Sequence, residues 1–196
     1  MGKEFILGLD IGSSSVRGGL FDTRGSMVRG SLVRIERKLR TTSDGGAEIS
    51  ANASLKQVVS VIDDVLSATE GVNGVITHIA ACTFWHSLLG ISTDGRPTTP
   101  VFGWADNRSR DFVARFRKDL SEAETHNRTG AHFHSSFWPA KLMWLRSEHP
   151  ELWRTTAKWI SIGDYLQQQL TGRIDTDLSI ASGTGVFDIR NCVWDE

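Results

Sequence analysis

The sequence predicts an α/β domain in which a mixed sheet is flanked by helices. Three observations predict it: residues 5–22 hold two apolar runs of strand type around a small polar turn, residues 50–69 have helical periodicity, and residues 75–82 are almost continuously apolar. With the shorter elements described below, the predicted order is β-β-β-α-β-β-β followed by a helical region.

The first predicted element is a β-hairpin. Its two strands are joined by Gly12 and the three serines at 13–15, a turn signal between strand-like runs. Such a turn leaves backbone N–H groups uncovered with hydroxyls beside them, and this combination can cradle a phosphate. Asp10 ends the first strand, where a carboxylate can hold a hydrated Mg²⁺ against that phosphate. Most glycine-serine turns are only turns, so both interpretations stay open at this point.

The next segments predict a three-stranded meander and a helix. Residues 27–33 alternate roughly and predict the third strand, whereas residues 34–46 are polar and charged and predict a surface loop or ragged strand. Residues 50–69 are the clearest helix, and Gly71 ends it. The apolar positions predicted to share one face are Leu55, Val58, Val59, Ile62, Val65 and Leu66.

Residues 75–82 predict a buried central strand, within which His78 is interpreted as a core histidine rather than a ligand. The pattern breaks at residues 83–87, at the strand end where ligands of α/β sheets usually bind. Trp85 and His86 lie in this break. Further strands are predicted at residues 88–92 and 100–104.

The remainder is mainly helical. Asp106 lies at the start of a predicted helix, where an N-cap is the default interpretation. The pair His132 and His134 lies in a loop and is weak evidence for a metal site, because no third ligand is apparent. The other predicted elements are a helical segment closed by Thr129 and Gly130, a helix from Pro139 to near His149, a strand at 159–162, helices at 164–170 and 176–182, and a strand at 186–188.

Composition restricts the class of protein. Of the 196 residues 39% are hydrophobic and 23% charged, which is ordinary for a soluble globular protein. The net charge of −1 argues against nucleic-acid binding as the main role. No apolar run approaches the ~20 residues of a membrane helix, and no signal-peptide pattern is present. Two cysteines, Cys82 and Cys192, favour reduced thiols in the cytoplasm.

Five segments together resemble the N-terminal domain of the FGGY carbohydrate kinases, which have the ribonuclease-H-like fold of the actin-like ATPases. Neither a Walker A loop nor a G-x-G-x-x-G motif is present. The resemblance covers the whole chain, so residues 1–196 are expected to form one sugar- and phosphate-binding domain. The segments are Gly8-Leu9-Asp10-Ile11-Gly12-Ser13-Ser14-Ser15, Trp85-His86-Ser87, residues 104–109, residues 139–145 and residues 177–185.

The resemblance implies a nucleotide site at the hairpin. ATP is then the phosphate donor, and Asp10 acts in catalysis by way of Mg²⁺. The residues expected to contact the β- and γ-phosphates are Gly12, Ser13, Ser14, Ser15 and Arg17.

The resemblance also implies a sugar site. A sugar needs an apolar face and several polar groups, and Trp85, His86, Trp104 and Asp106 supply that mixture. In xylulokinases of the family, the pair that matches Trp85 and His86 contacts the sugar, although methionine usually stands where this chain has tryptophan. Residues 104–109 and 179–185 are more similar to the gluconate kinase branch.

Gluconate would bring a carboxylate that needs a cation or a helix N-terminus. Arg108 and Lys141 are the candidates, and each is equally well interpreted as a surface charge on a helix.

The predicted function is therefore phosphoryl transfer from ATP to a hydroxyl of a sugar or sugar acid, with gluconate or xylulose favoured. Family members are much longer, and the resemblance places the catalytic base and the adenosine site in a second domain absent from this chain. We expect the fragment itself to be inactive and to expose an interdomain surface through which a homodimer can form. The alternative is a complete, non-catalytic sugar-binding or regulatory module with the same fold.

Overall fold

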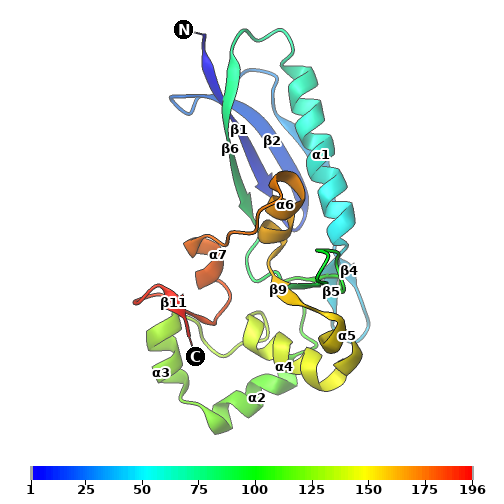
Figure 1. Cartoon of the computed structure of the whole chain (residues 1–196), viewed down its shortest axis with the longest axis vertical. Coiled ribbons are helices and arrows are strands. Elements are labelled where there is room, and N and C mark those ends of the chain that lie inside the picture. Colours follow the sequence, from blue (N-terminus) through cyan, green and yellow to red (C-terminus); the bar gives the residue numbers. More distant parts are fainter. Residues whose placement is uncertain (1, 196) are drawn as a thin grey trace. The chain divides into compact units, whose positions relative to one another are not determined.

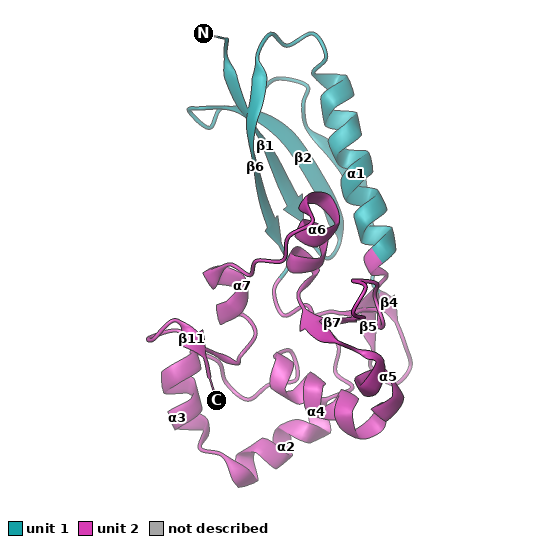
Figure 2. Cartoon of the chain, in the orientation of Figure 1, with its two compact units in different colours: residues 1–39, 52–84 teal, residues 40–51, 85–196 magenta. Residues whose placement is uncertain are grey.

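The described part of the chain, residues 2–195, divides into two compact units in the computed structural model. Unit 1 comprises residues 1–39 and 52–84, and unit 2 comprises residues 40–51 and 85–196 (Figure 2). No helix within residues 2–195 is both long and apolar enough to cross a membrane.

Unit 1 is built on a four-stranded mixed sheet with the order β3-β2-β1-β6 (Figure 1). β1 and β2 are antiparallel, β2 and β3 are antiparallel, and β6 is parallel to β1. A parallel neighbour needs a crossover connection, and a long helix, α1, supplies it. The predicted α/β class is therefore confirmed in this unit. The bounds are β1 (Glu4–Ile11), β2 (Ser15–Asp22), β3 (Val33–Glu36), β6 (Val75–Thr83) and α1 (Ala51–Ala68).

Helix α1 packs its apolar stripe against one face of this sheet. Val58, Val61 and Val65 are fully buried. The close approach depends on Gly18 in β2, because a Cβ there would lie only 2.5 Å from Cγ1 of Val61. Two members of the predicted face, Val59 and Leu66, are instead 40% and 45% exposed. The buried stripe is therefore narrower than the sequence pattern indicates.

The prediction that residues 75–82 form a buried central strand is wrong. The strand exists, but β6 lies at the edge of the sheet, and eight of its nine residues are exposed. His78 is exposed as well, so it is not a core histidine. The physical reason is that, among the described residues, β1 is the only strand that pairs with β6.

The third strand also lies later than predicted. Met27 forms only an isolated bridge with Phe21, and the strand that pairs with β2 is the polar β3. A turn takes the place of the predicted strand because the Ser31 hydroxyl donates to the carbonyls of Val28 and Leu20 at 2.8 and 3.3 Å. These bonds close the chain on itself before β3 begins.

Unit 2 combines short strand pairs with six helices among its described residues. Its three small sheets have the orders β4-β5-β8, β7-β9 and β10-β11. The strands are β4 (Arg40–Thr41), β5 (Ala47–Ile49), β7 (Leu89–Ile91), β8 (Val101–Phe102), β9 (Lys158–Ile160), β10 (Phe187–Asp188) and β11 (Val193–Trp194). The helices are α2 (Arg110–Asp119), α3 (Glu122–Thr129), α4 (Trp138–Glu148), α5 (Pro150–Thr155), α6 (Ile162–Thr171) and α7 (Leu178–Ser182).

The helix ends of unit 2 follow local sequence signals. Ser161 and Asp164 form a capping box at the start of α6, and Gly172 ends it in the left-handed region at φ 76°. Gly130 ends α3 in the same way at φ 70°. Each strand and helix predicted in residues 88–188 corresponds to an element of the structure. Three observed elements were not predicted, namely α5, β5 and β11. The core of the unit is formed by Leu88, Phe102, Phe112, Trp138, Trp144 and Leu145.

Candidate functional site

The turn between β1 and β2 presents two free amide groups. The Gly12 N–H donates to the Ser15 carbonyl at 2.9 Å and closes the turn. Within residues 2–195, the N–H groups of Ser13 and Ser14 donate to no protein acceptor. Ser14 is exposed and Ser13 is partly exposed. Adjacent free N–H groups in a tight turn can bind an anion, so this turn is a candidate phosphate cradle.

Asp10 lies beside this turn in the last part of β1. Its Oδ2 accepts a hydrogen bond from Nη1 of Arg17 on β2 at 3.2 Å, and both side chains are about half exposed. On the other side, the Cys82 thiol of β6 lies 3.7 Å from Oδ1. Burial raises the pKa of the Cys82 thiol, and the negative charge of Asp10 raises it further. The thiol therefore stays protonated at neutral pH. The carboxylate of Asp10 is about half exposed to solvent.

The donor set around Asp10 fits a hydrated Mg²⁺. The described residues contain no cluster of three His, Cys, Asp or Glu side chains that could hold a metal by themselves. Mg²⁺ is typically bound by one or two carboxylates together with waters and substrate phosphates, so a single half-exposed carboxylate beside a phosphate cradle is sufficient. Asp10 also lines an open groove of about 420 Å³ in unit 1, together with Gly8, Gly19 and Ala80.

In unit 2, His86 is held in an unusual backbone conformation. Its φ of 60° lies in the left-handed region, which His adopts more readily than bulky or β-branched residues. The ring Nδ1 lies 2.7 Å from the Gly183 carbonyl oxygen, and the ring packs edge-on against Phe137 at 4.6 Å between centroids. Burial lowers the pKa of His86, and the nearby charge of Lys141 lowers it further. The geometry favours a neutral imidazole.

Trp85 and Trp104 offer two half-exposed indole rings. They are 49% and 50% exposed, respectively. Trp85 lies over Gly183, where a Cβ would approach the ring to 3.3 Å, so a larger residue at this position would require the indole to shift slightly. Flat apolar rings of this kind suit the apolar face of a sugar.

Two contacts bring the Trp85–His86 and Trp104 segments together. Leu88 and Phe102 form an antiparallel bridge. Position 86, two residues before Leu88, therefore lies at the same end of the bridge as position 104, two residues after Phe102. The Ser136 hydroxyl donates to the Trp104 carbonyl at 2.8 Å, and the next residue, Phe137, packs on His86. Ser136, Phe137 and Gly183 were not predicted as site residues, and their contacts with Trp85, His86 and Trp104 follow from the fold.

Asp106 is buried rather than presented to a ligand. It is 1% exposed, and its carboxylate accepts from the Ala47 N–H at 3.1 Å and from the Arg108 side chain at 3.1 and 2.6 Å. The default interpretation of Asp106 as a helix N-cap is wrong. Helix α2 begins four residues later with Ser109 at its N-cap position. The carboxylate instead fixes the loop after β8 to strand β5.

Neither cation considered for a substrate carboxylate is a surface charge. Arg108 also donates to Glu48 at 3.1 Å, and its guanidinium lies 4.9 Å from the Trp144 ring centroid. Lys141 is buried, and its Nζ donates to the carbonyl of Ser135 at 2.9 Å and to that of Ser136. Burial lowers the pKa of Lys141 to about 7. Both groups already have protein partners in unit 2.

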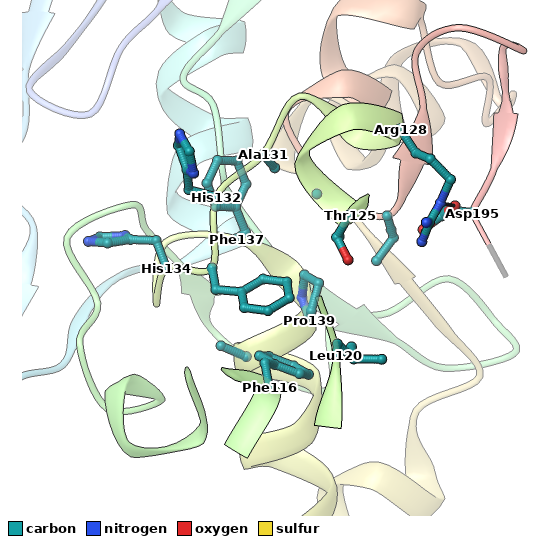
Figure 3. A pocket seen from close by; sticks show the side chains of 14 residues that line it. Phe116, Leu120, Thr125, Arg128, Ala131, His132, His134, Phe137, Pro139 and Asp195 are labelled. Carbon is teal, nitrogen blue, oxygen red and sulfur yellow. Dashed lines mark hydrogen bonds and ion pairs between the residues drawn. The ribbon is translucent and has the colours of Figure 1, made fainter. Parts of the chain in front are cut away.

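A separate apolar pocket of about 230 Å³ lies in unit 2 (Figure 3). Phe116, Leu120 and Pro139 contribute to its lining, and the ion pair between Arg128 and Asp195 stands at one wall with an Nε to Oδ1 distance of 2.7 Å. None of the residues predicted for the sugar site lines this pocket. Phe137, which was not predicted for the sugar site, lines the pocket and also packs against His86.

Comparison with known proteins supplies the family. Residues 5–196 match the model of the N-terminal domain of the FGGY family of carbohydrate kinases. A gluconokinase of Bacillus subtilis (strain 168) is 29% identical over 193 residues, which are 98% of this chain and 37% of that protein. A xylulose kinase of Lactococcus lactis subsp. lactis (strain IL1403) is 26% identical over 196 residues, which are 98% of this chain and 38% of that protein. This chain therefore spans less than two fifths of the length of these relatives.

Solved structures confirm the predicted fold. The crystal structure of a gluconate kinase from Lactobacillus acidophilus superposes with a TM-score of 0.90 at 29% identity and covers 98% of this chain and 38% of its own. A xylulose kinase from Rhodospirillum rubrum superposes with a TM-score of 0.91 at 21% identity over 97% of this chain and 39% of its own, which supports the fold alone. The chain belongs to the FGGY family of carbohydrate kinases, and it corresponds to the N-terminal domain of that family.

Proposed function

We propose that the whole protein to which this chain corresponds is an ATP-dependent kinase that phosphorylates a hydroxyl of a sugar or sugar acid, with gluconate or xylulose as the favoured substrates. One observation carries the proposal: two free amide groups at Ser13 and Ser14 lie beside the half-exposed Asp10 carboxylate, in a chain whose residues 5–196 match the N-terminal domain of the family. The activity is assigned to the cytoplasm, with which the two free thiols of Cys82 and Cys192 agree.

The hairpin residues bind and orient the phosphates. The N–H groups of Ser13 and Ser14 donate to phosphate oxygens, and Gly12 keeps the turn tight enough for a close approach of the backbone. Arg17, whose side chain reaches Asp10, adds positive charge at the edge of the cradle. Asp10 holds Mg²⁺, which neutralises negative charge on the phosphates when it is bound. The catalytic base and the adenosine site are expected in the part of the protein that this chain does not include.

The aromatic residues of unit 2 bind the sugar. Trp85 and Trp104 provide stacking faces, and the Nε2 of a neutral His86 accepts a hydrogen bond from a sugar hydroxyl. Asp106 acts through structure, since its bonds hold the segment that carries Trp104. Because Arg108 and Lys141 are already bonded, neutral donors or residues outside this chain would bind a gluconate carboxylate.

The test is a comparison of the whole protein with two matched variants. Asp10→Asn is expected to lower kcat by orders of magnitude with ATP, Mg²⁺ and gluconate or xylulose, because the metal loses its carboxylate. Glu4→Gln removes an exposed carboxylate from the opposite end of the same strand and is expected to leave kcat unchanged. Near-normal turnover by Asp10→Asn would contradict the role of Asp10. Failure to phosphorylate any sugar or sugar acid in a panel would contradict the proposed function.

A further inference from the structure

Arg37 lies directly behind the turn that joins β1 and β2. It is 9% exposed, although it sits in a polar stretch of sequence that predicts a surface segment. Its Nε and Nη2 both donate to the Gly12 carbonyl, with a distance of 2.8 Å from Nε, and its Nη1 donates to the Ser54 hydroxyl at 3.1 Å. Its backbone N–H donates to the Ser14 carbonyl at 2.9 Å. A single residue thus fixes two of the carbonyl groups of the turn.

These bonds determine where the free amides of the turn point. The Gly12 carbonyl and the Ser13 N–H belong to one peptide group, and in a trans peptide the two bonds point in opposite directions. Because the Gly12 oxygen is turned toward the buried guanidinium, the Ser13 N–H is directed away from it. A hydrogen bond to a cation also polarises the peptide group and makes its N–H a stronger donor. Arg37 therefore orients the first amide of the cradle.

The charge of Arg37 has no acidic partner in the described structure. No carboxylate of residues 2–195 forms an ion pair with it, and its other neighbour is the Phe84 ring, 5.6 Å from the guanidinium carbon. Burial lowers the pKa of Arg37 without an opposing carboxylate contribution. A buried charge without a partner is unfavourable, and an anion at the adjacent turn would compensate it.

We propose that Arg37 is a positioning residue for the phosphate cradle, which directs the Ser13 amide outward through the Gly12 carbonyl and supplies the uncompensated positive charge that favours a polyphosphate at the turn. This inference rests on the proposed function, because the polyphosphate it implies is that of the nucleotide. It assigns the turn a third component besides the free amides and Asp10, namely a buried cation that does not touch the ligand.

The experiment titrates this 196-residue chain with inorganic tripolyphosphate and follows the amide signals by NMR. Sodium chloride at matched ionic strength controls for screening. Arg37→Met is expected to weaken tripolyphosphate binding about tenfold or more, because the turn loses the bonds that orient the Ser13 amide and an uncompensated positive charge. Arg37→Lys, which keeps the charge but not the fork, is expected to recover part of the affinity.

A matched control separates position from charge. Arg34→Gln removes one positive charge from the same segment, but Arg34 is exposed and pairs with Glu36 at 3.3 Å, so affinity is expected to change less than about threefold. In the wild-type chain, the Ser13 and Ser14 amides and the Arg37 Nε–H are expected to shift together as tripolyphosphate saturates. If Arg37 had only a structural role, Arg37→Met would lower thermal stability, but the Arg37 Nε–H signal of the wild-type chain would not move when tripolyphosphate binds.

The outcomes distinguish this inference from the proposed function. Equal affinity of Arg37→Met and wild type, or an equal loss in Arg34→Gln, overturns the role of Arg37 and leaves the phosphate cradle intact. No binding by the wild-type chain overturns the phosphate cradle and with it the role of Arg37, whereas the kinase activity of the whole protein is tested separately by phosphorylation of the sugar panel. If Arg37→Met does not fold, the wild-type Arg37 Nε–H decides: a signal that stays fixed at saturation overturns the inference, and a signal that moves with the Ser13 amide supports it.

Discussion

The Nδ1 atom of His86 lies 2.7 Å from the carbonyl oxygen of Gly183. A carbonyl oxygen can only accept a hydrogen bond, so Nδ1 carries the proton. In the neutral ring, Nε2 is then an acceptor with a fixed orientation. The contact with Gly183 thus sets both the tautomer of His86 and the polarity of the group that the proposed sugar site presents.

The pH dependence of His86 follows from its burial. Its pKa is lowered from 6.5, mainly by burial; the hydrogen bond to the Gly183 carbonyl acts in the opposite direction, and the nearby charge of Lys141 lowers the pKa further. The unfolded chain binds the proton more readily, so the stability due to His86 is present above pH 6.5 and is lost as pH falls through the lower, folded-state pKa. An NMR titration of the ring Cε1–H is expected to give a midpoint below 6.5. A midpoint at or above that value would contradict the assignment.

Variants at His86 check the same linkage by stability. His86→Asn tolerates the left-handed backbone and removes the titrating ring, so the slope of stability against pH over this window is expected to decrease. The measurement is urea denaturation at several pH values. Identical slopes for wild type and His86→Asn would argue against a perturbed His86.

Lys141 is predicted to stabilise the segment that precedes α4. Lys141→Met removes the donor of the Ser136 carbonyl and leaves the Ser135 carbonyl with the Ser109 hydroxyl alone, which is expected to cost about 1–3 kcal/mol in the free energy of unfolding. Lys158→Met, at an exposed position, is the matched control and is expected to change stability by less than about 0.5 kcal/mol. Urea denaturation measures both. A Lys141→Met chain as stable as the control would contradict the structural role.

The loss in the free energy of unfolding caused by Lys141→Met is also expected to depend on pH. The pKa of Lys141 is lowered from 10.5 to about 7 by burial, so the unfolded state binds the proton between these values. The wild-type contribution is complete above pH 10.5 and is lost as pH falls through about 7. The difference between wild type and variant should therefore grow with rising pH across this window. A difference independent of pH would contradict the lowered pKa.

Asp106 is predicted to be a structural anchor of unit 2. Asp106→Asn removes the charge that faces the buried Arg108 guanidinium, which is expected to lower the free energy of unfolding by about 3 kcal/mol. Asp94→Asn is the matched control, because Asp94 pairs with Arg96 at the surface, with a side chain 55% exposed. It is expected to change stability much less than Asp106→Asn, because solvent screens an exposed ion pair. Equal effects of the two substitutions in urea denaturation would contradict the importance of the buried pair.

The sequence predicted what is local in this chain. The hairpin, α1 and the capped ends of α3 and α6 depend on neighbours within a few residues, and their signals are direct. The roles of Arg37 and Asp106 depend on Gly12 and Ala47, which lie 25 and 59 residues away. A charged residue in a polar stretch predicts a surface position, and only the fold shows that such a residue is buried and hydrogen-bonded to a distant backbone group.

The prediction for β6 failed for a different reason. Its apolar pattern is typical of a strand covered on both faces and both edges. Ile76 and Ile79 are instead 38% and 63% exposed, because no described element covers them. The apolar pattern therefore indicates a strand that is covered by other residues, and the described residues do not cover it.

This exposed strand leads to a prediction about association. Among the described residues, β6 pairs with β1 along one edge only, so its other edge offers unpaired backbone groups next to apolar side chains. The isolated chain is expected to self-associate through β6, with a dimer as the simplest product. Burial of an isoleucine contributes about 1.5–3 kcal/mol, so Ile79→Lys is expected to raise the dissociation constant about tenfold or more.

The control for this prediction lies in unit 2. Leu178 in α7 is 63% exposed, the same fraction as Ile79, and Leu178→Lys introduces the same charge on an equally exposed apolar residue. Sedimentation equilibrium is expected to show weaker association for Ile79→Lys and unchanged association for Leu178→Lys. A strictly monomeric wild-type chain at high concentration would contradict an adhesive β6, and equal loss of association in both variants would assign the effect to charge. In the whole protein, β6 is expected to be covered, so Ile79→Lys there should lower stability rather than change the oligomeric state.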